Sequence, residues 1–368
     1  MKRTYSIIAF GEPLTEVLLD QTPRQQEIKD QKQMSNLLRY STFNAVSGDV
    51  VNFIGNYTVL KKLLSREFAL KPETVGLITE TGADEFGKKI KKTLNKLSSP
   101  SAVINTNLIS LIQREKSGIY GIRVLDNKGN YKFYFDRFGY AFENALRKST
   151  LEKFIKICSQ AYYFYTTGIA LMMSKNYSLF PILFERLQKQ GTRIVFDTNF
   201  RKTVACHANI PDIHQLLLKI YSKVNIMLAG EEDIRFLYPN LASLSTEKLV
   251  NEFYCFWDKE NLSKKRLIIK CGANGVYWFD NKLNHIPIVI NDLKKCENNI
   301  LHPEGAGDAF NAGYILARYY GKNINACIKF GCMTASLLVR VQGCFRDMLP
   351  FNNSKTALIN SFRPCIPT

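Results

Sequence analysis

Short runs of β-branched and aromatic residues alternate along most of the 368-residue chain with longer amphipathic stretches. Short apolar runs are typical of buried strands, whereas apolar residues spaced three and four apart are typical of helices that cover a sheet. We expect strands at 5–10, 75–79, 160–168, 192–200, 224–230, 266–272 and 275–279, and helices at 83–97, 173–191, 210–223, 231–238 and 309–320. The alternation predicts an α/β fold: a three-layer α/β/α body with a mainly parallel central sheet.

Two segments break this alternation. Residues 13–43 are polar and irregular, and residues 101–137 contain consecutive strand-like runs with a hairpin turn expected at 127–130. We therefore expect one domain spanning residues 1–368, with a small β-sheet subdomain formed from about 13–43 and 101–137. An inserted sheet of this kind is suited to act as a lid.

Charge and composition narrow the classes of function. No apolar run approaches the roughly 18 residues that span a bilayer, and the nine cysteines show no metal-binding spacing, so we expect a cytoplasmic protein without a membrane partner. The net charge is +18, but the basic residues are spread in ones and twos. This charge favours a solvated surface or the attraction of an acidic substrate, and we expect no nucleic-acid partner because no binding signature is present.

A turn of small residues precedes one carboxylate. Gly305, Ala306 and Gly307 stand directly before Asp308 and the periodic run 309–320. Small residues let a phosphate approach the first amides of a helix, which lack backbone partners and lie at the positive end of the helix dipole. Asp308 could accept a hydroxyl proton while those amides hold the charge that develops on a transferred phosphoryl group. The alternative is an aspartate that only helps to start a helix.

Residues 305–313 resemble the C-terminal signature of the ribokinase-like (PfkB) carbohydrate kinases, and the resemblance extends along nearly the whole chain. Residues 7–18 look like that family's opening strand and Gly-Glu turn, and residues 47–56 are similar to its sugar-binding segment. Residues 75–90 match its usual strand, Gly-x-Asp and helix, and residues 267–279 resemble its turn on the nucleotide side.

Within the family the chain most resembles the 2-keto-3-deoxygluconate kinases, at residues 117–146 and 195–201. The resemblance implies a catalytic turn of Gly305, Ala306, Gly307 and Asp308, substrate contacts from Gly48, Asp49, Asn52, Tyr120, Arg137, Asn199 and Arg201, nucleotide contacts from Lys270, Gly272 and Gly275, and metal contacts from Glu232 and Asp233. A sugar acid carries a carboxylate, which arginine binds bidentately. For each of the two arginines an ordinary ion pair is the alternative.

The chain departs from the family pattern at four places. Gly230 replaces the asparagine of an Asn-x-x-Glu motif whose last position is Asp233, and His-Pro-Glu at 302–304 replaces a segment close to Asp-Thr-Thr. Ser47 replaces the first glycine of a Gly-Gly-Asp run, and Phe135 lacks the hydroxyl group of an expected tyrosine. These departures keep open a non-catalytic relative that binds ligand without turnover.

The resemblance implies a reaction as well as a fold. ATP and Mg²⁺ would be the cofactors, and the γ-phosphoryl group would pass to a hydroxyl group of a sugar or sugar acid, with 2-keto-3-deoxygluconate as the expected substrate. A homodimer through the lid is also implied. The alternative within the family is a fructokinase, ribokinase or nucleoside kinase that acts on a neutral sugar.

Overall fold

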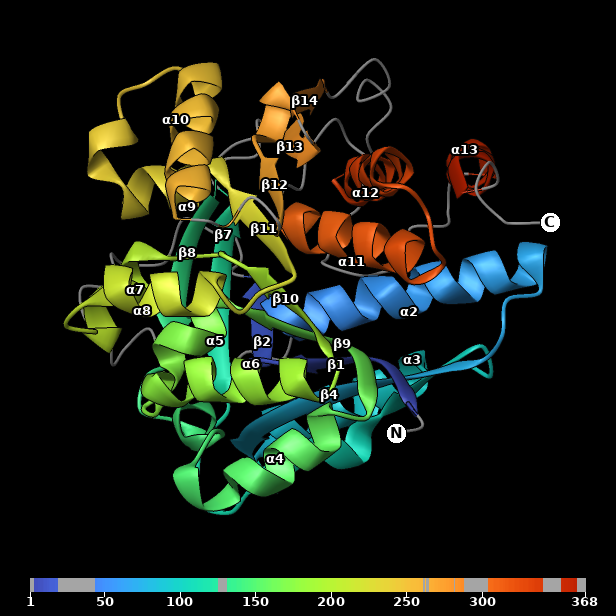
Figure 1. Ribbon diagram of the computed structural model, residues 1–368. Coiled ribbons are helices and arrows are strands. Elements are labelled where there is room, and N and C mark those ends of the chain that lie inside the picture. The colour runs from blue at the N-terminus through green and yellow to red at the C-terminus, as the bar shows by residue number, and fades with distance from the viewer. Residues whose placement is uncertain are drawn as a thin grey trace. The chain divides into compact units, whose positions relative to one another are not determined.

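The computed structural model describes residues 3–18, 44–124, 131–260, 262, 265–280, 282–287, 304–339 and 352–362. The hairpin turn expected at 127–130 lies outside these residues. The chain forms two compact units, whose elements are labelled in Figure 1. The first unit comprises 1–11, 73–78 and 143–289, and the second unit comprises 12–72, 79–142 and 290–368.

The first unit is built on a mainly parallel sheet. Its strands follow the order β14-β13-β12-β11-β10-β9-β1-β4, in which β12, β13 and β14 pair antiparallel and the others pair in parallel. The bounds are β1 (Tyr5–Phe10), β4 (Glu73–Gly82, of which 73–78 belong to this unit), β9 (Ala161–Thr167), β10 (Arg193–Asp197), β11 (Ile226–Gly230), β12 (Arg266–Lys270), β13 (Val276–Asp280) and β14 (Lys282–Ile286). The strands expected from the sequence are confirmed.

Amphipathic helices connect these strands. They are α4 (Leu151–Cys158), α5 (Gly168–Met173), α6 (Phe180–Lys189), α7 (Lys202–Ala208), α8 (Ile213–Tyr221), α9 (Glu231–Leu237) and α10 (Thr246–Lys259). In α6 the apolar spacing places Leu183, Phe184 and Leu187 on one fully buried face. The Phe184 ring meets the Phe196 ring of β10 edge-on at 6.3 Å, so this face packs on the sheet.

The second unit contains a separate four-stranded sheet in the order β3-β2-β7-β8. Its strands are β2 (Leu14–Leu18), β3 (Asn44–Ser47), β7 (Gly118–Val124) and β8 (Tyr131–Asp136). The expectation that residues 13–43 are irregular is wrong for 14–18, because Leu14 is buried with Tyr120 and Ile122 of the neighbouring strand. Strands β5 (Ala102–Asn105) and β6 (Ile109–Ile112) stand apart from this sheet, since β6 pairs with the second half of β4.

Helices of the second unit are α2 (Asp49–Phe68), α3 (Glu85–Leu97), α11 (Ala306–Tyr319), α12 (Ile324–Leu338) and α13 (Asn352–Phe362). Helix α11 packs against both α2 and α12 (Figure 1). A Cβ atom at Gly313 of α11 would lie 2.5 Å from Thr334 Oγ1 of α12, so glycine is what allows this close approach. The packing fixes the start of α11 beside α2.

The predicted α/β fold, with a large mainly parallel sheet and a separate small sheet, is confirmed. Short 3₁₀ helices complete the described elements, at Thr106–Leu108, Ala141–Asn144, Lys148–Thr150, Tyr177–Leu179, Pro239–Leu241 and Gly272–Asn274. None of the described helices has the length and apolar character that a bilayer crossing requires.

Candidate active site

The small-residue turn leads directly into α11, as the sequence predicts. Gly305 is the residue before the helix and has φ +74°, a conformation that favours glycine. Asp308 lies in the first turn and is 9% exposed, whereas Gly305 and Ala306 are half-buried and Gly307 is exposed. The first amides of α11 are therefore close to solvent while the neighbouring carboxylate is nearly enclosed.

Helix α2 brings the sugar-binding segment to this carboxylate. Asn52 is 5% exposed, and its Nδ2 donates to Asp308 Oδ2 at 3.0 Å. Gly48 precedes α2 with φ +106°, and a Cβ atom there would lie 2.6 Å from the carbonyl oxygen of Glu12, so a larger residue does not fit. The Asp49 carboxylate accepts from the backbone amide of Val50 at 2.8 Å. Two motifs that are about 250 residues apart in the chain thus meet at Asp308.

A chain of hydrogen bonds extends from this contact into the small sheet. Ser47 Oγ donates to Asn52 Oδ1 at 3.2 Å and lies 2.8 Å from the hydroxyl oxygen of Tyr120. The Tyr120 hydroxyl donates to Glu16 Oε2 at 2.5 Å. The ring of Tyr120 stacks on Phe135 with centroids 5.9 Å apart, so the phenylalanine that replaces the expected tyrosine contributes a packing surface here.

Arg137 is enclosed in the same unit and is paired with a carboxylate. It is 4% exposed, and its Nε and Nη2 both donate to Glu12 Oε2, with Nε at 2.9 Å. Glu12 is 2% exposed. The ion pair that the sequence leaves as an alternative for Arg137 is therefore present, and contact with a substrate stays a prediction.

The residues expected on the nucleotide side lie in the first unit, at the ends of β10 and β12. Lys270 Nζ donates to Asp197 Oδ1 at 2.8 Å, and Asp197 is 2% exposed. Between β12 and β13, Gly275 has φ +89°, and a Cβ atom there would lie 2.1 Å from the Ile286 carbonyl oxygen. Gly272 also has a positive φ, +51°, but open space around it. Both expected glycines of this turn therefore adopt positive φ angles, which favour glycine.

Asp233 of α9 holds the end of β10 in place. Its Oδ2 accepts from Thr198 Oγ1 at 2.5 Å, and its Oδ1 accepts from the backbone amide of Phe200 at 3.0 Å. Burial raises the pKa of the Asp233 carboxyl, while the Thr198 hydroxyl that donates to it acts in the opposite direction. Arg201 Nη1 lies 3.7 Å from the same carboxylate, and its side chain is 53% exposed. Asn199 has φ +32°, which is uncommon for a residue other than glycine.

The expected metal ligands have different surroundings. Both oxygens of Asp233 accept hydrogen bonds from the protein, whereas Glu232 is exposed. Glu231 Oε1 accepts from Arg235 and Thr246. The described residues contain no group of three or more His, Cys, Asp or Glu side chains placed to hold a metal ion. Of the two expected ligands, Glu232 alone keeps a carboxylate open to solvent.

Several residues of these networks were not predicted. Glu16, Ser47 and Thr198 form the contacts that orient Tyr120, Asn52 and Asp233, but single hydroxyl and carboxyl residues carry no periodic signal. Ser47 stood out only as a departure from a glycine pattern, which indicated a loss and not a new contact.

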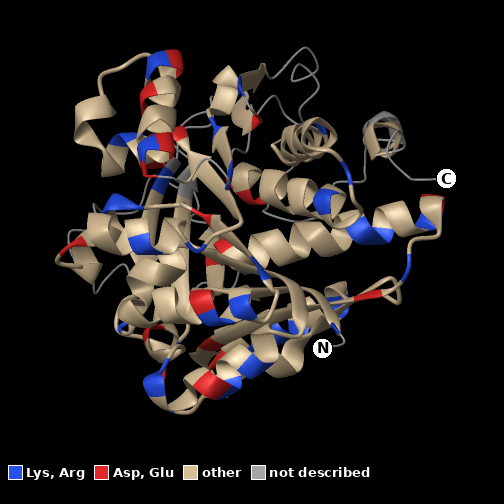
Figure 2. Cartoon of the chain, in the orientation of Figure 1, with Lys and Arg blue, Asp and Glu red and all other residues tan. Residues whose placement is uncertain are grey.

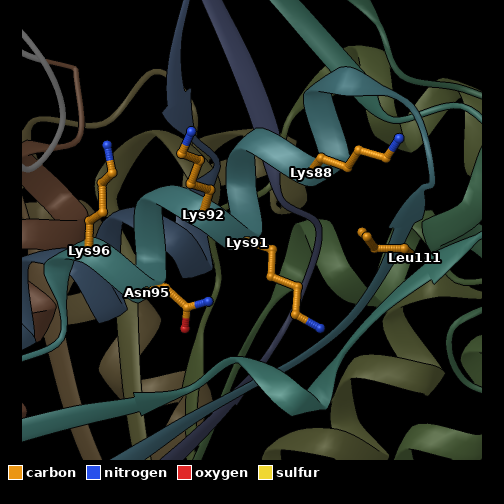
Figure 3. A pocket seen from close by; sticks show the side chains of 6 residues that line it. All are labelled: Lys88, Lys91, Lys92, Asn95, Lys96 and Leu111. Carbon is orange, nitrogen blue, oxygen red and sulfur yellow. The ribbon is translucent and has the colours of Figure 1, made fainter.

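Helix α3 carries five lysines, Lys88, Lys89, Lys91, Lys92 and Lys96, whereas on α4 and α10 basic and acidic residues stand side by side (Figure 2). Four of these lysines line an open cavity of about 480 Å³, drawn in Figure 3, together with one amide and one apolar side chain: Lys88, Lys91, Lys92, Asn95, Lys96 and Leu111. None of the predicted site residues lines it. The cavity therefore accounts for part of the net positive charge without belonging to the site.

Comparison with known proteins identifies the class. The model of the pfkB family of carbohydrate kinases matches residues 57–351. A 2-dehydro-3-deoxygluconokinase from Haemophilus influenzae is 26% identical over 292 residues, which cover 79% of this chain and 87% of that protein. The chain belongs to the pfkB family of carbohydrate kinases and is a phosphotransferase that acts on a sugar.

Solved structures share the fold. An Arabidopsis thaliana ribokinase complexed with ribose and ATP has a TM-score of 0.66 at 16% identity, covering 98% of this chain and 99% of that one. An Xylella fastidiosa fructokinase with bound ATP has a TM-score of 0.67 at 18% identity, covering 96% of this chain and 98% of that one. At these identities the likeness shows the ribokinase-like fold alone.

Proposed function

We propose that this chain transfers the γ-phosphoryl group of ATP to a hydroxyl group of a sugar acid, 2-keto-3-deoxygluconate, with Asp308 as the base. The contact that carries the proposal is the one between Asn52 Nδ2 and Asp308 Oδ2, because it joins the sugar-binding segment to the carboxylate in the first turn of α11 and orients that carboxylate. The small-residue turn before Asp308 supports a phosphate beside the first amides of α11.

The residues of the chain would act by alignment and charge stabilisation. Asp308 would remove the proton of the hydroxyl group as that oxygen attacks phosphorus, and the amides of 305–307 would hold the charge on the transferred group. Nearly complete burial of Asp308 would exclude water from the base. Closure of the small sheet over the sugar is the movement we propose to complete this exclusion.

Within the described part of the chain, magnesium fits as a partner of the nucleotide. Mg²⁺ takes oxygen ligands and is usually bound by one or two carboxylates together with phosphates and waters. Glu232 is exposed and could supply such a carboxylate, whereas the oxygens of Asp233 already accept hydrogen bonds. The ion would neutralise the phosphate charge that develops during transfer. Lys270, paired with Asp197, is the cation we propose to lie towards the nucleotide.

A sugar acid is supported by the relatives and by Arg201. The Haemophilus influenzae relative is a 2-dehydro-3-deoxygluconokinase. The guanidinium of Arg201 lies 3.7 Å from Asp233 but is half-exposed, so it could also bind a substrate carboxylate. A second candidate is a neutral sugar, because Arg137 is already paired with Glu12 and its positive charge is compensated. The two candidates differ in whether the substrate's own carboxylate is needed.

One assay decides among these functions. ADP release is measured with ATP, Mg²⁺ and a panel of 2-keto-3-deoxygluconate, other sugar acids, fructose and ribose. The wild-type chain should turn over the sugar acid fastest, and Asp308→Asn should lower kcat about 100-fold or more while substrate binding is largely kept. Normal turnover by this variant would show that Asp308 is not the base. Binding without ADP release would support the non-catalytic alternative.

We also propose that two copies pair through the small sheet. Phe133 of β8 is 44% exposed and its ring stacks on Phe135, so it offers an apolar contact at the surface of this sheet. Sedimentation of the wild-type chain should give a dimer, and Phe133→Asp should give a monomer. A monomeric wild-type chain would rule the pairing out.

A further inference from the structure

Ser47 lies in the hydrogen-bond chain that ends at Asp308, at a position where the family pattern expects glycine. We propose that Ser47 is a positioning residue of the kinase reaction: its hydroxyl group orients the Asn52 amide, and that amide holds the Asp308 carboxylate. The inference rests on the proposed function, because it takes Asp308 as the base.

The two ends of the Asn52 amide face partners of opposite character. An ionised carboxylate only accepts hydrogen bonds, so the end that lies 3.0 Å from Asp308 Oδ2 must be the NH₂ group. The amide oxygen then faces Ser47 Oγ at 3.2 Å and needs a donor there. An amide turned over would place oxygen against oxygen at Asp308. The carboxylate selects this orientation, and the hydroxyl group at 47 supplies the donor that the amide oxygen then needs, which a glycine could not.

The proton of Ser47 has a second acceptor within reach. Tyr120 directs its own proton to Glu16 Oε2 at 2.5 Å, so its oxygen can accept from Ser47 Oγ at 2.8 Å. The single proton of Ser47 is thus shared between Tyr120 and Asn52. A sugar hydroxyl that donates to the Tyr120 oxygen would release this proton to Asn52. Occupation of the sugar site would in this way strengthen the hold on Asp308.

These groups are buried, so the loss of any one of these hydrogen bonds has a cost in free energy. Ser47 is 1% exposed, Asn52 is 5% exposed and Tyr120 is 7% exposed, so water has little access to replace a lost partner. A buried acceptor that loses its donor bears the cost of desolvation without compensation. In Ser47→Ala the amide oxygen of Asn52 would lose its donor, and the amide could rotate away from Asp308.

Substitution of Ser47 should affect catalysis more than binding. Ser47→Ala should lower kcat roughly threefold to tenfold, the effect of one neutral hydrogen bond, and should change the KM for ATP little. Tyr120→Phe should instead raise the KM for the sugar and keep kcat, because the Ser47 proton then belongs to Asn52 alone. A purely structural role would not lower kcat alone in the first variant and raise the KM for the sugar alone in the second.

A double-mutant cycle tests whether Ser47 acts through Asp308. In the full chain, with ATP, Mg²⁺ and 2-keto-3-deoxygluconate, Ser47→Ala should lower kcat of the wild type but should have no further effect in the Asp308→Asn background. An equal decrease in both backgrounds, or no decrease in the wild type, would overturn the inference. Thr58→Ala is the matched control, since its buried hydroxyl donates to the Ile54 carbonyl oxygen in α2 at 2.8 Å, and it should leave kcat unchanged.

The two proposals fail in different ways. Normal turnover by Asp308→Asn, or the absence of ADP release in the wild type, would refute the proposed function. A crystal structure of Ser47→Ala decides the inference without any assay of turnover. The Asn52 amide should have lost its hydrogen bond to Asp308 in that structure, and an unchanged bond would refute the role of Ser47. If Ser47→Ala does not fold, Ser47→Gly, which introduces the residue of the family pattern, takes its place: a roughly threefold to tenfold lower kcat supports the inference and an unchanged kcat overturns it.

Discussion

The buried pair of Glu12 and Arg137 allows the stability of the second unit to be tested directly. Both side chains are almost fully enclosed, at 2% and 4% exposure, and two guanidinium nitrogens donate to one carboxylate oxygen. Removing one member leaves a buried charge without its partner, which costs about 3–5 kcal/mol. Glu12→Gln and Arg137→Met should each lower the free energy of unfolding of this unit by that amount. With a urea m-value of about 3 kcal/mol per M, the midpoint should fall by roughly 1–2 M.

The double variant separates pairing from simple loss of packing. Replacing both charges removes the penalty of an unpaired ion, so Glu12→Gln with Arg137→Met should cost clearly less than the sum of the single changes. The exposed pair of Arg186 and Glu152 is the control, and its removal should leave the urea midpoint unchanged. If the single changes at 12 and 137 cost under about 1 kcal/mol, or if the costs simply add, the two charges are not coupled as the structure indicates.

Three further substitutions test the local geometry of the first unit. Gly275→Ala should destabilise by about 3 kcal/mol or more, because φ is +89° and the new Cβ would meet the Ile286 carbonyl oxygen at 2.1 Å. Gly272→Ala should cost only about 1–2 kcal/mol, since its positive φ is strained but its surroundings are open. Thr198→Val should cost about 1.5–3 kcal/mol, because a carboxylate loses a donor. That loss should be largest above the folded-state pKa of Asp233, where the carboxyl is ionised, and should shrink as the pH falls through it. Urea unfolding at neutral and acidic pH measures all three, and a pH-independent cost at 198 would contradict the assigned bond.

The sequence predicts elements whose polar and apolar faces differ. In α3 the buried residues Phe86, Ile90 and Leu94 recur at the spacing of one helix face, and the helix was expected within two residues of its bounds. Helix α2 was missed because its residues 49–61 are all buried, so polar and apolar positions show no helical period there. Strand β2, Leu-Thr-Glu-Val-Leu, was missed because its polar and apolar residues do not alternate and because it begins a segment that is polar as a whole.

The contacts of the candidate site could not be predicted in the same way. Glu12 and Arg137 are 125 residues apart, and only the pairing of β2, β7 and β8 brings their ends of the sheet together. Motif positions indicate which backbone segments converge, as for Asp308 and Asn52, because the glycine turns and helix starts leave a local pattern. Whether an arginine there is open to a ligand or already paired depends on a partner that the motif does not include.

The position of Asp308 is determined by more than its own helix. Gly305 sets the start of α11, and Gly313 lets α11 approach α12 closely, so the backbone of the turn is fixed by packing. The orientation of the carboxylate is fixed separately, by the Asn52 amide and through it by Ser47. The signature at 305–313 therefore specifies the position of the carboxylate. Ser47, which lies outside 305–313, contributes to its orientation through the Asn52 amide. Substitution of Ser47 should then lower kcat roughly threefold to tenfold while every residue of 305–313 is intact.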